Sequence, residues 1–149
     1  MLTFAFHPPF SAFPVALIAV VVLLEIVTVI FKKDWSAKAA TFILILAVIG
    51  VIAAFFSGYQ ASEHADQSFK IPDEAIAQHH LFGKLLLFVS IPCLVLKFFS
   101  LKAKYSIAFF KYTYLVFLFA ALGLVIQTGY LGGKLVFELG AGVKAQSNK

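Results

Sequence analysis

Residues 10–31 read FSAFPVALIAVVVLLEIVTVIF, an apolar stretch that contains a single ionisable side chain, Glu25. A helix rises 1.5 Å per residue, so about 20 residues cross the roughly 30 Å of hydrocarbon in a bilayer. This stretch is long enough to span a membrane, and it predicts the class of the whole protein.

Three more apolar stretches follow outward from the first, at about residues 39–59, 79–99 and 109–130. With 62% hydrophobic and 13% charged residues, the chain lies far from the composition of soluble domains, which are about one quarter charged. A segment alone in lipid must satisfy its own backbone hydrogen bonds, and these runs lack the alternation of barrel strands. We expect residues 1–149 to form one all-α domain, a four-helix transmembrane bundle whose last span is broken by Gly129, Gly132 and Gly133.

The lysines predict how the bundle sits in the membrane. Lysines flank or fill the connections around residues 32–38 and 97–111, whereas residues 58–78 carry four acidic residues against Lys70 alone. The positive-inside rule places the lysine-rich connections in the cytoplasm. Both termini and an acidic loop over residues 58–78 are then expected on the non-cytoplasmic side of a bacterial inner membrane. The net charge of +5 suits an anionic inner leaflet and does not require nucleic acid.

Several function classes have no signature in this chain. The one cysteine, Cys93, lies inside the third span, and no CxxCH, phosphate-binding loop, GxSxG or HExxH motif occurs. Covalent c-type haem attachment is therefore excluded, and standard hydrolase and nucleotide chemistry has no visible site in the sequence. An electron carrier or redox-complex subunit is favoured over a stand-alone enzyme.

All four histidines fall near the same end of a predicted span: His7 before the first, His64 after the second, and His79 and His80 at the start of the third. Alternating crossings bring these positions to one face of the membrane. Imidazole is a common metal ligand, and a bundle holds haem b with two imidazoles on opposite sides of the iron. His7 and His79 are the candidate pair, although any one histidine at a membrane surface is most often simply solvated.

Helical spacing separates the two neighbouring histidines. From His79 it leads to Gly83, Leu86, Ser90 and Cys93, a stripe suited to close packing or to a bound planar group. From His80 it leads to Lys84, which favours the lipid and headgroup side. His79 is the better ligand candidate and His80 the alternative. His64, with Glu63 and Asp66 beside it, offers instead a zinc or nonhaem iron site with His7 and one of the pair.

Two further sets of polar residues lie within the spans. Gln127, Thr128 and Tyr130 reach the histidine-bearing face, where Gln127 is a candidate hydrogen-bond donor to a haem propionate or a quinone carbonyl. Glu25 is costly in lipid unless it is paired or protonated, and Lys97 lies near the same end of its span. A structural ion pair is favoured over a proton relay.

The chain also resembles a bacterial family of small four-helix membrane proteins, domain of unknown function 2231. The resemblance rests on an HP-x-x-x-x-FP opening at residues 7–14, on Gly58, Ala61, Ile76 and His79, and on the GG-x-LV-x-x-x-G-x-GV ending at residues 132–143. It covers nearly the whole chain. Related domains occur beside cytochrome c modules, so the resemblance implies a cytochrome b-like electron-transfer role with His7 and His79 as ligands. The doubled histidine departs from the pattern and leaves His79 and His80 as alternatives.

The expected function is thus electron transfer through a bis-histidine haem b near the periplasmic face, between a quinol or membrane reductase and a periplasmic cytochrome c. The alternative is a haem-free scaffold subunit of a larger respiratory complex or a homo-oligomer. Its contact surface would be the small-residue stripes and 24 aromatic side chains (18 Phe, 5 Tyr and 1 Trp). Both readings place the protein in the lipid bilayer.

Overall fold

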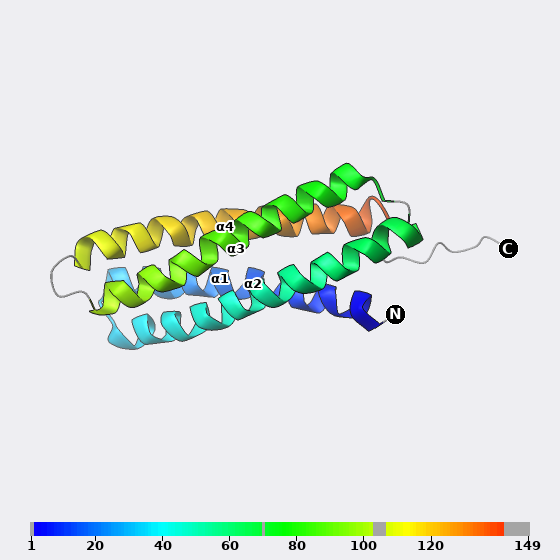
Figure 1. Ribbon diagram of the computed structural model, residues 1–149. Helices are drawn as coiled ribbons and strands as arrows, with labels where there is room; N and C mark the ends of the chain where they lie inside the picture. The colour runs from blue at the N-terminus through cyan, green and yellow to red at the C-terminus, as the bar shows by residue number, and fades with distance from the viewer. Residues whose placement is uncertain (1, 70, 103–106, 142–149) are drawn as a thin grey trace.

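Four helices make up nearly all of the computed structural model, which describes residues 2–69, 71–102 and 107–141 (Figure 1). They are α1 (Leu2–Phe31), α2 (Asp34–Phe69), α3 (Asp73–Lys102) and α4 (Ile107–Phe137). Each helix contains a stretch that is long and apolar enough to cross a membrane, and each expected span lies within one of them. The predicted all-α, four-helix class is confirmed.

The helices run beyond the expected spans at the end that carries the histidines. α1 begins at Leu2, ahead of Pro8 and Pro9, and α4 continues through Gly129, Gly132 and Gly133 to Phe137. The expectation that these glycines break the fourth helix was wrong. In an apolar environment an unpaired backbone group costs several kcal/mol, which outweighs the roughly 0.5–1 kcal/mol that a helical glycine costs.

The acidic segment expected as a loop is also mostly helical. α2 extends to Phe69 and α3 begins at Asp73, so only a short connection separates them. Asp73 and Glu74 occupy the first turn of α3, where the helix dipole favours negative charge. The backbone of His64 therefore lies on α2 and not in a loop; its side chain, like those of Glu63 and Asp66, lies outside the described part of the structure.

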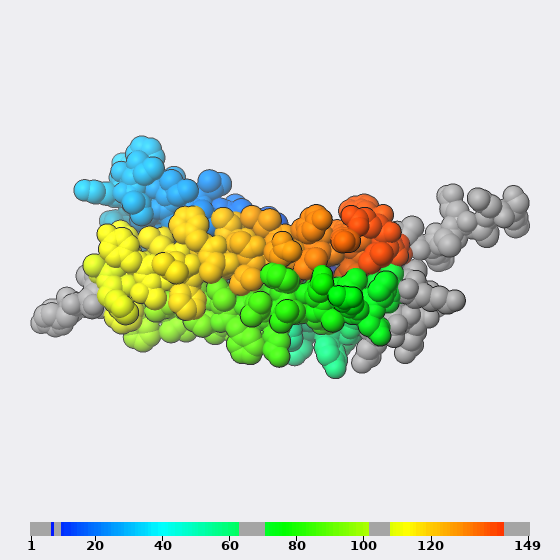
Figure 2. All heavy atoms as spheres, turned by 90° about the horizontal axis from the view of Figure 1, so that it is seen from above, coloured from blue at the N-terminus to red at the C-terminus, as the bar shows by residue number. Residues whose placement is uncertain are grey.

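The helices form a square bundle of two hairpins. In the described residues α1 packs against α2 and α4, and α3 packs against α4 and α2, with the closest packing inside the pairs α1–α2 and α3–α4. Figure 2, seen over α4, shows α3 and α1 on its two sides. α1 and α3 are thus diagonal and run parallel. Their first residues, with the ends of α2 and α4, form what we call the histidine end (Figure 1).

Apolar side chains cover the outside of the bundle as well as filling its inside. The outer surface carries large apolar side chains, among them Phe13, Leu23, Phe42, Phe88 and Val116. In the helix contacts, small residues are buried beside larger ones such as Leu44, Leu118 and Tyr114; the small ones include Ala40, Ala47, Cys93 and Ala121, each at most 2% exposed. Lipid is as apolar as the protein interior, so helices associate through close packing at small residues. The outer surface is the one that contacts the bilayer.

Candidate functional site

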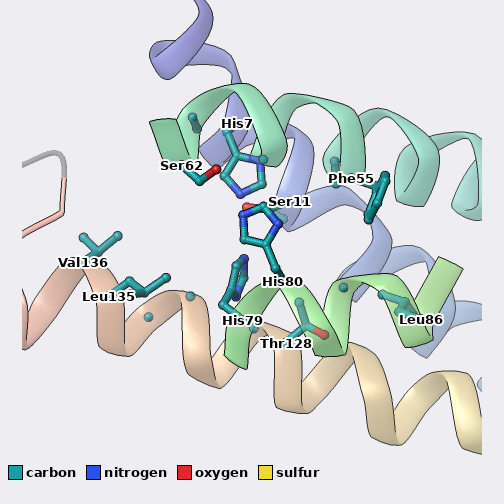
Figure 3. A pocket seen from close by; sticks show the side chains of 18 of the residues that line it. His7, Ser11, Phe55, Ser62, His79, His80, Leu86, Thr128, Leu135 and Val136 are labelled. Atoms are coloured by element: carbon teal, nitrogen blue, oxygen red, sulfur yellow. The ribbon is translucent and has the colours of Figure 1, made fainter. Parts of the chain in front are cut away.

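A cavity of about 570 Å³ opens at the histidine end, where all four helices contribute to its wall (Figure 3). His7, His79 and His80 line it, together with apolar or small side chains such as Val51 and Val125. Its volume lies in the range of about 300–1,000 Å³ that is usual for cofactor and ligand pockets. An apolar chamber with a few convergent imidazoles is a candidate binding site.

The imidazole of His7 is oriented by α2. Its Nδ1 lies 3.1 Å from Oγ of Ser57, and that hydroxyl donates to the carbonyl of Ala54 at 3.2 Å. Since the hydroxyl proton is used at Ala54, the serine oxygen accepts the Nδ1 proton of His7. This tautomer, inferred from the hydrogen bonds, leaves the lone pair on Nε2. A bound Nδ1–H is the usual support for a metal-ligating histidine.

The electrostatic surroundings also favour neutral His7. Burial lowers the pKa of this imidazole below its usual value, and the nearby His80 lowers it further, against an opposing backbone hydrogen bond with Ala54. An unperturbed histidine has a pKa of about 6.5. His7 is therefore uncharged at neutral pH, as a metal ligand must be.

His79 reaches the same cavity from α3. Its ring centroid lies 6.2 Å from that of His7, with the ring planes 82° apart, so the rings meet edge to face. Among the described residues its buried Nδ1 has no hydrogen-bond partner, although the backbone of Thr128 lies close by. Buried polar atoms are nearly always paired. This nitrogen is the atom that a small ring movement or a bound group would satisfy.

Each of these two imidazoles rests on a glycine of the neighbouring helix in its own hairpin. A Cβ built on Gly58 would lie 2.8 Å from Cε1 of His7, and one on Gly132 would lie 3.2 Å from Cε1 of His79. A side chain at either glycine would push the ring toward the centre of the cavity. The glycines therefore make the room in which the two rings face each other.

Gly58→Ala is expected to destabilise the protein by about 1–3 kcal/mol, the usual effect of overpacking an interior site. The new methyl group overlaps His7, and α1 or the ring must move. Thermal unfolding in detergent measures the effect. Gly123→Ala is the matched control, because its methyl meets no atom within 4 Å. Equal melting temperatures for the two variants would show that His7 is not held against Gly58.

His80 does not occupy the lipid-facing position that its spacing with Lys84 favoured. It is half-buried and lines the cavity, 6.3 Å from His79 and 6.2 Å from Tyr59 between ring centroids (Figure 3). Lys84 itself is exposed. Neighbouring helical residues point about 100° apart. The cavity faces α3 over a wider arc than that, so both rings reach it.

The imidazoles of His7, His79 and His80 are not arranged as a three-ligand site for a metal ion. Within the described side chains, no group of three or more His, Cys, Asp or Glu residues is placed to hold one. The zinc or nonhaem iron site expected from His64, Glu63 and Asp66 lies outside the described side chains. The described imidazoles meet in pairs instead, His7 with His79 and His79 with His80.

Some of the other expected site residues line the cavity and others do not. Gly83 lines the wall, and Leu86, Ser90 and Cys93 continue inward from it as buried residues. Gln127 is not among the residues that line the cavity. On α4 the wall is formed by Val125, Thr128, Gly129 and Gly132, which share one helical face, and Gln127 points about 100° away from Thr128.

A second polar cluster lies deep in the bundle, toward the opposite end. The structure joins Glu25 of α1 and Lys97 of α3 in an ion pair, and Tyr114 of α4 donates a hydrogen bond to Oε1 of Glu25 at 3.2 Å. The ammonium lies 4.9 Å from the centroid of the Tyr114 ring. All three residues are at most 5% exposed. Tyr114 was not identified from the sequence as a member of this cluster. An aromatic residue with a hydroxyl group, at the same depth in the membrane as Glu25, could have indicated it.

The comparisons with known proteins agree with the architecture. No curated protein and no solved structure matches the chain. One family does, over nearly all of the sequence. Residues 3–145 match the model described as predicted membrane protein (DUF2231), and the chain therefore belongs to this family.

Proposed function

We propose that this membrane protein binds haem b between His7 and His79 and transfers electrons. The observation that carries the proposal is the facing of two imidazoles from diagonal helices, 6.2 Å apart between centroids, in an apolar cavity. A bond from a metal to an imidazole nitrogen is about 2 Å long, so His7 and His79 would both be within reach of one metal centre at this ring separation. The rings of this pair meet edge to face, so a rotation of one ring would be needed to aim a nitrogen of each imidazole at a shared metal centre.

The remaining residues of the cavity suit the same group. Ser57 holds Nδ1 of His7 and leaves Nε2 free, and the unpartnered Nδ1 of His79 has the Thr128 backbone within reach of a small rotation. Apolar walls exclude water from a macrocycle, and Gly58 and Gly132 leave space beside the rings. Haem held in this way supplies one-electron redox chemistry, tuned by its axial ligands and burial.

Two protein ligands would leave no position for a substrate, which supports electron transfer over catalysis. The lysine-rich segment between α1 and α2 lies opposite the histidine end, so the positive-inside rule supports a periplasmic position for the cavity (Figure 1). We therefore propose a quinol or membrane reductase as donor and a periplasmic cytochrome c as acceptor.

The test is a visible-range spectrum of the protein purified from membranes, followed by a pyridine haemochrome assay. The expected result is a sharp b-type α-band on reduction, with haem stoichiometric with the chain. A colourless protein that also fails to take up added hemin would overturn the proposal. Elemental analysis and the size of the purified assembly would then separate a zinc or nonhaem iron site from a scaffold subunit.

A further inference from the structure

Glu25 and Lys97 are the two charged side chains that are buried in the described part of the chain. They join α1 to α3, the diagonal helices that also carry His7 and His79. The same two helices are thus bridged twice, once at the histidine end and once toward the opposite end.

The spacing of the two bridges is the same on both helices. His7 and Glu25 are 18 residues apart, and so are His79 and Lys97. In an α-helix this separation is about five full turns, or about 27 Å, and it returns to the same face. Because α1 and α3 run parallel, a sliding movement of one helix changes both bridges by an equal distance.

We propose that the ion pair of Glu25 and Lys97, with Tyr114, sets the axial register of α1 against α3 and thereby holds His7 opposite His79. A slip of one turn, about 5.4 Å, breaks the ion pair and separates the two imidazoles together. The purpose of this register rests on the proposed haem site. The register itself is a property of the chain and is measurable without haem.

An ion pair specifies register where apolar contacts do not. When helices slide in a bilayer, an apolar side chain can exchange one apolar neighbour for another, whereas a separated charge finds no other partner in the apolar interior. A buried carboxylate or ammonium that loses its partner is strongly destabilising, although the intact pair contributes little net stability. The hydrogen bond from Tyr114 adds α4 to the same fixed point. All three residues act through helix position and not on the bound group.

The test measures the distance between α1 and α3 in the full-length, haem-free chain in lipid nanodiscs. Spin labels are placed at Phe13→Cys and Leu81→Cys, both at exposed positions, and the chain without these cysteines controls for labelling of buried Cys93. Double electron–electron resonance is compared for the parent, for an apolar pair (Glu25→Leu with Lys97→Met) and for a charge exchange (Glu25→Lys with Lys97→Glu).

The apolar pair keeps the bundle folded, because apolar replacement of a buried ion pair is often neutral or stabilising. It is expected to broaden or shift the distance distribution and to weaken hemin binding at least tenfold, whereas the charge exchange restores both toward the parent. An apolar pair with the parent's narrow distribution and hemin affinity would overturn the proposal, since the ion pair would then be only a stabilising contact. If the apolar pair does not fold, a charge exchange that differs from the parent in distance overturns it. Failure of every variant to bind hemin, with the expected distances, would refute the haem site and leave the register intact.

Discussion

His7→Ala and His79→Ala are each expected to abolish the b-type α-band of the reduced protein. The two rings face each other across the cavity, and removal of either leaves a haem iron with one protein ligand and an enlarged chamber. The expected change is a loss of stoichiometric haem in the pyridine haemochrome assay, with unchanged insertion into the membrane. Hemin titration of the apo-proteins measures the same effect as a fall in affinity.

Three controls sharpen this assignment. His64→Ala is expected to keep the band, since the facing pair does not include this residue. His80→Ala should also keep it, because the proposed ligand pair does not include His80, whose ring contacts those of His79 and Tyr59. Ser57→Ala should retain the ligands but weaken hemin binding by about 10- to 100-fold, the usual effect of losing an orienting hydrogen bond. Loss of the band in His80→Ala, with retention in His79→Ala, would transfer the ligand role to His80.

Lys97→Met is expected to be the most destabilising single change in the membrane interior, by about 3–5 kcal/mol. It leaves the carboxylate of Glu25 buried with only the Tyr114 hydroxyl as a partner. Unfolding in mixed detergent, followed by circular dichroism, measures the loss. The yield of folded protein from membranes should fall with it.

Adding Glu25→Leu to Lys97→Met is expected to recover most of the lost stability, because it removes the unpaired charge. A double-mutant cycle gives the coupling between the two side chains. Lys84→Met is the control on the same helix; its side chain is exposed, and a change within about 0.5 kcal/mol is expected. A Lys97→Met protein that unfolds like the parent would show that the ion pair does not contribute to the stability of the bundle.

Particular residues show why the sequence predicted the helices better than their ends. The run over residues 10–31 predicts a span from apolar content alone, and all four such runs are helices. Pro8, Pro9 and the glycines at 129–133 mark helix ends in water, yet here the helix continues through them. The acidic segment before Phe69 likewise remains helical. Glycine, proline and charged residues report the intrinsic helix propensity of a segment. The length of a helix near a membrane depends instead on keeping its backbone groups hydrogen-bonded.

A chain that crosses the membrane an even number of times returns to the side from which it started. This rule was enough to place the histidine positions at one end of the bundle. It did not show which rings meet. The contact of His7 with His79 depends on α1 and α3 being diagonal, and the support from Ser57, Gly58 and Gly132 depends on how each hairpin closes. Helical spacing favoured a lipid-facing His80, which lines the cavity, and Gln127 is not among the lining residues. Spacing gives relative directions but not the position of the cavity.

The amino-acid sequence by itself determined that this protein is a four-helix membrane bundle with His7, His79 and His80 at one end. The length of each apolar stretch and an even number of membrane crossings are enough for this, and neither requires knowledge of how the helices pack. The tertiary structure alone decided that His7 faces His79, that glycines make room for both rings, and that Tyr114 joins Glu25 and Lys97. Those contacts depend on which helices are neighbours and on their axial register. Neither quantity is set by the apolar character of a span, since lipid and protein interior are nearly equivalent surroundings for it.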